Sequence, residues 1–206
     1  MTIVKVCGLT RAEDVDAALD SGADWLGFIH VPQTPRYVER PLLERLSARA
    51  AGRATRVIVV QNAAPSLLED LRKNLDFEYF QFHGREPLDF VDRYKGYKVF
   101  HIRDGAPPAE ELKAHGPPFL LDTQVGSRRG GTGRPFDWSI LPAVAGPYLV
   151  AGGLEPDNVA ELVSRYRPWG VDVSSGVERE RRAKDHDKLK RFIDNVRRAR
   201  NERYSL

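Results

Sequence analysis

Short apolar runs rich in β-branched residues alternate with amphipathic segments along the whole chain. Strands that alternate with helices form βαβ units, so this order predicts a parallel sheet. The predicted strands are Ile3–Cys7, Trp25–Ile29, Arg56–Val60, Phe77–Phe82, Lys98–Ile102, Phe119–Asp122, Tyr148–Ala151 and Trp169–Val173. The predicted helices include Ala12–Asp20, Leu42–Ala50, Ser66–Asn74, Pro87–Tyr94 and Pro156–Tyr166.

Eight short strands of continuous apolar character suit a closed parallel barrel, in which each strand is buried on both faces. The competing fold is an open doubly wound sheet, which would carry Gly-x-Gly-x-x-Gly after its first strand. The first strand here continues as Gly8-Leu9-Thr10 and does not match. The 206 residues show no linker or shift in composition, so we predict α/β architecture and one (β/α)8 TIM-barrel domain over residues 1–206.

The last two predicted strands end in a similar way. In Leu149–Leu154 a short apolar strand is followed by a glycine pair, and in Val171–Gly176 a strand is followed by a small polar turn with a glycine. Neighbouring strand ends of this type present backbone N–H groups and hydroxyls to one anion, as in the phosphate site after strands 7 and 8 of a barrel. The sequence therefore predicts a phosphate on the ligand.

The charge and the cysteine content of the chain bear on its binding partners and its cellular compartment. The formal net charge is +3, and basic residues gather in Lys188–Arg203, but Leu189, Phe192, Ile193 and Val196 recur there at helical spacing. We therefore predict a docked helix with a basic outer face and no nucleic-acid partner. One cysteine excludes an internal disulfide, and we find no signal peptide or membrane-length apolar run, so we expect a cytoplasmic protein without membrane contact.

Functional groups of a parallel barrel gather at the carboxyl ends of its strands. Those ends carry Cys7, His30, His83, His101 with Arg103, and Asp122. A following helix start and basic surroundings would lower the pKa of Cys7, and partial burial would raise that of Asp122. The two side chains would then form a base and an acid facing each other across the barrel mouth.

Each candidate also has a plain structural interpretation. Cys7 could be a small buried hydrophobe, Asp122 a helix cap, His83 a hydrogen-bonded residue at the core edge and Arg36 a surface cation. A zinc site built from Cys7, His83, His101 and Asp122 is a further alternative. No element supplies two histidines at ligand spacing, so we predict no metal.

Two local features carry further predictions. Thr10 and Glu13 have the spacing of a capping box at the start of the first helix. The glycine-rich, basic stretch Gln124–Pro135 follows the sixth strand and is typical of a mobile active-site loop.

Several motifs occur together in one order, and they resemble the phosphoribosylanthranilate isomerase family of tryptophan biosynthesis. They are Lys5–Thr10, Thr34–Tyr37, Gln81–Gly84, Leu121–Thr123, Gly130–Trp138, Ala151–Leu154 and Gly170–Glu178. The resemblance extends from Ile3 to the final helix. It implies a cofactor-free Amadori rearrangement of a small phosphosugar, N-(5-phosphoribosyl)anthranilate, by an enzyme that is a monomer or a homodimer.

The resemblance also implies a role for individual residues. Asp122 is the general acid that protonates the furanose oxygen, and Cys7 is the general base that takes the proton from C2 of the sugar. Arg36 approaches the anthranilate carboxylate, and His83 lies in the substrate pocket. The phosphate is held by Gly153, Ser174, Ser175 and Gly176, and closure of the loop after the sixth strand depends on Gly130, Gly131 and Gly133. Asp172 is expected to be structural.

The chain departs from the family pattern after Glu178, where Pro-Gly often precedes Lys-Asp-His. Here Arg179–Ala183 contains neither residue, which leaves the shape of this turn open. Two alternative functions also remain open. One is a histidine-pathway-type isomerase, which Cys7 disfavours because such barrels typically carry an aspartate at that position. The other is a barrel that binds a phosphate ligand without catalysis.

Overall fold

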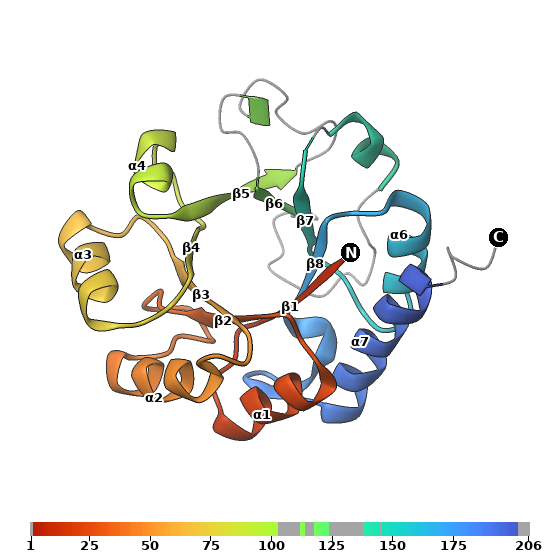
Figure 1. Ribbon diagram of the computed structural model, residues 1–206, viewed down its shortest axis with the longest axis horizontal. Helices are drawn as coiled ribbons and strands as arrows, with labels where there is room; N and C mark the ends of the chain where they lie inside the picture. Colours follow the sequence, from red (N-terminus) through yellow and green to blue (C-terminus); the bar gives the residue numbers. More distant parts are fainter. Residues whose placement is uncertain (1, 103–111, 114–117, 124–137, 145, 202–206) are drawn as a thin grey trace.

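The computed structural model describes residues 2–102, 112–113, 118–123, 138–144 and 146–201. Eight parallel strands pair in chain order, and the last pairs with the first, which closes a barrel (Figure 1). The strands are β1 (Ile3–Cys7), β2 (Trp25–Ile29), β3 (Thr55–Val60), β4 (Tyr79–Phe82), β5 (Gly96–Ile102), β6 (Phe119–Thr123), β7 (Tyr148–Ala151) and β8 (Gly170–Val173). The predicted (β/α)8 TIM barrel is therefore confirmed.

The helices surround the barrel (Figure 1). They are α1 (Ala12–Ser21), α2 (Arg40–Ala50), α3 (Pro65–Asn74), α4 (Leu88–Arg93), α6 (Val159–Tyr166) and α7 (His186–Asn201), with short 3-10 helices η1 (Trp138–Ala143) and η2 (Ser175–Val177). A small antiparallel hairpin, β9 (Glu178–Glu180) with β10 (Ala183–Lys184), connects β8 to α7. None of the helices in the described ranges has the length and apolar character needed to cross a membrane.

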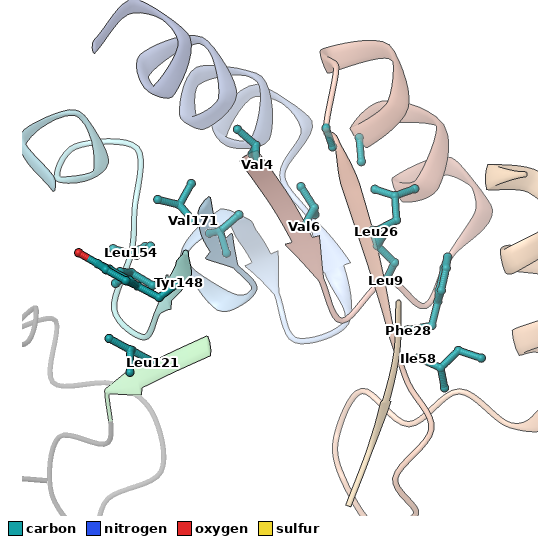
Figure 2. Close-up of a cluster of buried hydrophobic side chains, with 14 of the residues drawn as sticks. Val4, Val6, Leu9, Leu26, Phe28, Ile58, Leu121, Tyr148, Leu154 and Val171 are labelled. Atoms are coloured by element: carbon teal, nitrogen blue, oxygen red, sulfur yellow. The ribbon is translucent and has the colours of Figure 1, made fainter. Parts of the chain in front are cut away.

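The strands bury side chains on both faces, in two separate layers. Side chains such as Val4, Val6, Leu26, Phe28 and Ile58 pack outward against the helices (Figure 2). The inner layer fills the barrel and consists of Trp25, Val57, Tyr97, Val99, Leu120, Leu149 and Ala151. Successive strand residues point to opposite faces, so the sequence assigns each side chain to one of these layers.

The last helix matches its prediction. Leu189, Phe192, Ile193 and Val196 are buried on one face of α7, which packs against α1 and α6. Fully burying an apolar side chain of this size stabilises a fold by about 1.5–3 kcal/mol.

Some predicted boundaries were wrong. β4 begins at Tyr79 rather than Phe77, because its pairing with β3 starts at Val57 and Tyr79; the Phe77 ring packs against the Phe80 ring with centroids 4.7 Å apart. The helix predicted from Pro156 begins at Val159, since turn residues precede it.

The capping box was also wrong. Arg11 is the N-cap residue of α1 and makes no side-chain capping bond. The Thr10 hydroxyl instead donates to the carbonyl of Arg182 at 2.8 Å. A tertiary contact with the β9–β10 hairpin has therefore replaced the local cap.

Candidate active site

One cavity of about 330 Å³ collects most of the predicted site residues. It is lined by Cys7, Arg36, His83, Asp122, Gly153, Ser174, Ser175 and Gly176, together with further polar and apolar residues, among them Gln61, Gln81, Asp172 and Leu120. These residues follow or end β1, β2, β4, β6, β7 and β8, so the cavity lies at the carboxyl ends of the strands. Gly130, Gly131 and Gly133 lie outside the described residues.

The strand period explains which side chains reach the cavity. Cys7 ends β1, and Asp122 belongs to β6, which is separated from β1 by β8 and β7 around the barrel. Both side chains line the cavity, so they approach it from different sides. The geometry leaves space for a ligand between a thiol and a carboxyl group.

The loops after β7 and β8 approach each other closely. Gly153 has φ +65°, a conformation that favours glycine. A Cβ atom on Gly176 would overlap the carbonyl oxygen of Leu154, so only glycine fits there without a shift of the backbone. The Ser174 hydroxyl is buried and has no hydrogen-bond partner among the described residues, so it is available to a ligand. These features suit the phosphate site predicted from the two strand ends.

The environment of Cys7 differs from the expected one. Burial raises the pKa of the Cys7 thiol, and the nearby cations Lys5 and Lys184 oppose that increase without overcoming it. The sequence argument assigned a lowering of the pKa to a helix start, but α1 begins only at Ala12. Burial is the stronger influence, because removing the thiolate from water disfavours its charge.

Asp122 lies between two histidines. Its Oδ2 atom is 3.7 Å from Nε2 of His83 and 3.7 Å from Nδ1 of His101. Burial lowers the pKa of His83, and attraction to Asp122 opposes this change. His83 is therefore neutral at pH 7, and an uncharged imidazole beside Asp122 can exchange hydrogen bonds with a ligand.

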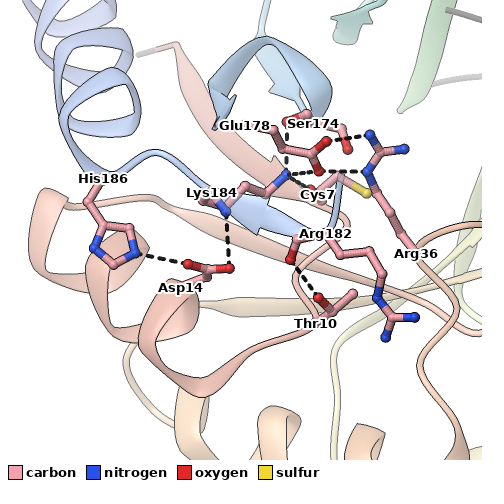
Figure 3. Close-up of polar contacts among 9 residues, drawn as sticks. All are labelled: Cys7, Thr10, Asp14, Arg36, Ser174, Glu178, Arg182, Lys184 and His186. Carbon is pink, nitrogen blue, oxygen red and sulfur yellow. Dashed lines mark hydrogen bonds and ion pairs between the residues drawn. The ribbon is translucent and has the colours of Figure 1, made fainter. Parts of the chain in front are cut away.

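Arg36 is joined to Lys184 through Glu178 (Figure 3). The Lys184 ammonium also donates to the carbonyls of Cys7 and Ser174, each at 2.8 Å. One buried cation thus ties the end of β1 to the end of β8. Burial lowers the pKa of Lys184, although Glu178 opposes the shift.

The sequence interpretation assigned no role to three residues of this region, which are Lys5, Glu178 and Lys184. Asp172, which was expected to be structural, pairs with Lys5 and also lines the cavity. Lys5 lies two positions before Cys7 on one strand, and this spacing could have revealed it. Lys184 carried no such signal, because its position depends on the fold of the hairpin.

The alternative zinc site does not assemble in the part of the chain that the structure describes, where no group of three or more histidine, cysteine, aspartate or glutamate side chains could hold a metal ion.

Comparisons with known proteins identify the family of the chain. Residues 4–195 match the family model described as N-(5'phosphoribosyl)anthranilate (PRA) isomerase. The N-(5'-phosphoribosyl)anthranilate isomerase of Chromohalobacter salexigens is 40% identical over 200 residues, which cover 95% of this chain and 94% of that protein.

Solved structures with the same fold are similar over nearly the whole chain. The crystal structure of phosphoribosyl anthranilate isomerase from Thermotoga maritima superposes with a TM-score of 0.88 at 35% identity and covers 96% of this chain and 99% of its own. A second structure, in complex with reduced 1-(o-carboxyphenylamino)-1-deoxyribulose 5-phosphate, has a TM-score of 0.84 at 33% identity, with the same coverage. The chain therefore belongs to the N-(5'-phosphoribosyl)anthranilate isomerase family.

Proposed function

We propose that the protein catalyses the Amadori rearrangement of N-(5-phosphoribosyl)anthranilate to 1-(2-carboxyphenylamino)-1-deoxy-D-ribulose 5-phosphate in tryptophan biosynthesis. The observation that carries this proposal is the position of Cys7 and Asp122 on different sides of one cavity that also contains the two glycine-rich strand ends. Family membership supports it.

In the proposed mechanism, Asp122 donates a proton to the furanose ring oxygen. The C1–O bond breaks, and the nitrogen lone pair forms a Schiff base at C1. Cys7 then removes the proton from C2, and the electron pair forms the C1–C2 double bond of an enolamine. Tautomerisation of the enolamine gives the ketone. Two proton-transfer groups suffice for these steps, so we infer that no cofactor is required.

The remaining residues bind the substrate in this proposal. Arg36 faces the cavity and can offer its guanidinium to the anthranilate carboxylate. His83 contacts the sugar as a neutral imidazole. The phosphate binds to backbone N–H groups and hydroxyls at Gly153, Ser174, Ser175 and Gly176, which compensate its charge without a lysine or a metal.

The proposal also covers the organisation of the protein. We infer one catalytic domain over residues 1–206, acting in the cytoplasm as a monomer or homodimer on a phosphosugar. The single cysteine of the chain supports a reducing compartment. Light scattering during size-exclusion chromatography measures which of the two assemblies is present.

The decisive experiment mixes the purified protein, in the presence of a chelator, with freshly made phosphoribosylanthranilate and follows the loss of anthranilate fluorescence. We expect the loss to exceed spontaneous hydrolysis, with the ribulose product confirmed by its mass. Phosphosugar binding without this conversion would contradict the isomerase and favour a non-catalytic binding protein.

A further inference from the structure

Lys5 is a fully buried lysine inside the barrel. Its ammonium Nζ donates to Oδ2 of Asp172 at 2.9 Å, and the exposed fractions of the two side chains are 0% and 7%. The two residues are register partners on β1 and β8, so the sheet itself places the charges together. Burying a lysine is costly unless its charge is compensated, and Asp172 supplies that compensation.

The same ammonium adjoins the Cys7 sulfur. Lys5 and Cys7 are two residues apart on β1 and point to the same face, and the charge of Lys5 opposes the rise that burial causes in the pKa of the thiol. Gly27 on β2 is the register partner of Cys7. A Cβ atom added to Gly27 would lie 2.7 Å from Sγ of Cys7 and 3.0 Å from Nζ of Lys5. Sulfur and ammonium therefore share the space that the missing side chain leaves open.

The other cations near Cys7 have partners of their own. The Lys184 ammonium binds two carbonyl oxygens and the Glu178 carboxylate, and the Arg36 guanidinium binds Glu178. The hydroxyl of Tyr97, a further ionisable neighbour, donates to Gln81. Of the cations near Cys7, Lys5 opposes the effect of burial on the pKa of the thiol most strongly, and Asp172 is the anion that acts against it.

We propose that Lys5 is a positioning residue whose ammonium, anchored by Asp172, is the counter-ion of the Cys7 thiolate. Ionisation of a buried thiol places a negative charge where water cannot solvate it, and an ammonium already fixed beside the sulfur stabilises that charge. The Cys7 sulfur lies beside Gly27, its register partner on β2, and Cys7 lines the cavity. This inference rests on the proposed function in that it takes Cys7 as the base.

Cys7 is the only cysteine of the chain, so alkylation reports its ionisation alone. We would measure the rate of iodoacetamide alkylation against pH for the wild-type protein, Lys5→Met and Asp172→Asn. An opposite charge within reach shifts a pKa by about one unit or more. We expect the midpoint to rise by about one pH unit or more in Lys5→Met and to fall in Asp172→Asn, which removes the competing anion. Lys188→Met, an exposed lysine of α7, is the control and keeps the wild-type midpoint.

Shifts in opposite directions distinguish this role from general damage to the fold. An unchanged midpoint in folded Lys5→Met, or an increased midpoint in Asp172→Asn, would overturn the proposal. If Lys5→Met does not fold, the double variant Lys5→Met/Asp172→Leu replaces the ion pair with a neutral pair, and its midpoint must exceed that of Asp172→Asn, which keeps the ammonium. The alkylation titration uses no substrate, so its result tests the role of Lys5 independently of the reaction. The fluorescence assay tests the proposed reaction itself.

Discussion

Arg36 is held by Glu178 through two hydrogen bonds, from Nε to Oε1 at 2.7 Å and from Nη2 to Oε2 at 2.5 Å. Burial alone would raise the pKa of Glu178, but its bonds to Arg36 and Lys184 outweigh burial and lower it. A bidentate ion pair of this kind fixes the plane of the guanidinium. A guanidinium has five N–H donors, so Arg36 can bind Glu178 and still offer donors to a ligand carboxylate.

The first prediction concerns Arg36→Lys. An ammonium is a point charge and cannot keep both bonds to Glu178 while it contacts a substrate carboxylate. We expect KM for phosphoribosylanthranilate to rise about tenfold or more, with a smaller change in kcat, because the lost contact exists before the reaction as well as during it. Steady-state kinetics measures both constants. Arg40→Lys, on a surface arginine paired with Glu44, is the matched control, and an equal KM in both variants would refute the role of Arg36.

The second prediction concerns the acid and the base. Cys7→Ser and Asp122→Asn keep the size of each side chain but remove its proton-transfer ability at neutral pH. A positioned acid or base contributes about 10²–10⁴-fold to a rate, and we expect each variant to lose at least the lower part of that range in kcat. Product binding, measured by calorimetry, should be retained. Asp194→Asn, which alters a surface ion pair with Lys190, is the control and should keep the wild-type kcat. A wild-type kcat in Cys7→Ser would contradict the assignment of Cys7 as the base.

The strand period explains how much of the site could be predicted. Cys7 and Asp122 are strand-end residues, and a barrel brings such ends to one mouth, so their common cavity followed from the order of the elements. Lys5 lies on the same strand face as Cys7, but its ion pair with Asp172 depends on the register between β1 and β8. No local pattern determines that register.

The contacts of the hairpin between β8 and α7 could not be predicted from the sequence. Thr10 was predicted to cap α1, yet its hydroxyl binds the hairpin carbonyl of Arg182. Lys184 reaches the ends of β1 and β8 only because the hairpin folds back over them. These contacts join segments that lie more than 160 residues apart, so no short stretch of the sequence contains both partners.

The third prediction concerns the pH dependence of stability at His83. Burial holds the folded-state pKa of His83 below the unfolded value of 6.5. The unfolded chain therefore binds a proton more readily, so the stability contributed by neutral His83 is complete above pH 6.5 and is lost as pH falls through the folded-state pKa.

Urea unfolding at pH 7 and pH 5 tests this prediction. His83→Gln keeps a polar side chain that does not titrate, so it should lose less stability between the two pH values than the wild-type protein. His186→Gln removes an exposed histidine paired with Asp14 and controls for the general effect of losing an imidazole. Equal losses in wild type and His83→Gln would contradict the neutral state of His83.

The fourth prediction concerns Gly176→Ala. The added methyl group would overlap the Leu154 carbonyl, so the loops after β7 and β8 must separate. Overpacking of this type costs about 1–3 kcal/mol of stability, and separation of the loops should also weaken phosphate binding. Gly52→Ala strains an exposed turn at φ +70° and meets no atom within 4 Å, so it should lose stability without losing affinity for inorganic phosphate. Wild-type phosphate affinity in Gly176→Ala would argue against a phosphate site there.

The fifth prediction concerns the turn of the β9–β10 hairpin. Arg182 has φ +77°, although it is not glycine. The left-handed conformation costs a residue with a Cβ atom about 1 kcal/mol, whereas glycine adopts it freely. Because glycine also makes the unfolded chain more flexible, the net gain from Arg182→Gly is smaller, up to about 1 kcal/mol of added stability.

Arg181→Gly is the matched control for this prediction. Arg181 is exposed and adjacent, and it is absent from the residues with positive φ in the described chain. Glycine there gains no relief of backbone strain and adds freedom to the unfolded chain, so Arg181→Gly should destabilise the protein by a few tenths to about 1 kcal/mol. Urea unfolding should show a higher midpoint for Arg182→Gly and a lower one for Arg181→Gly, with unchanged slopes. Midpoints that move in the same direction would mean that the lost arginine contacts, rather than the backbone conformation at Arg182, determine the stability of the turn.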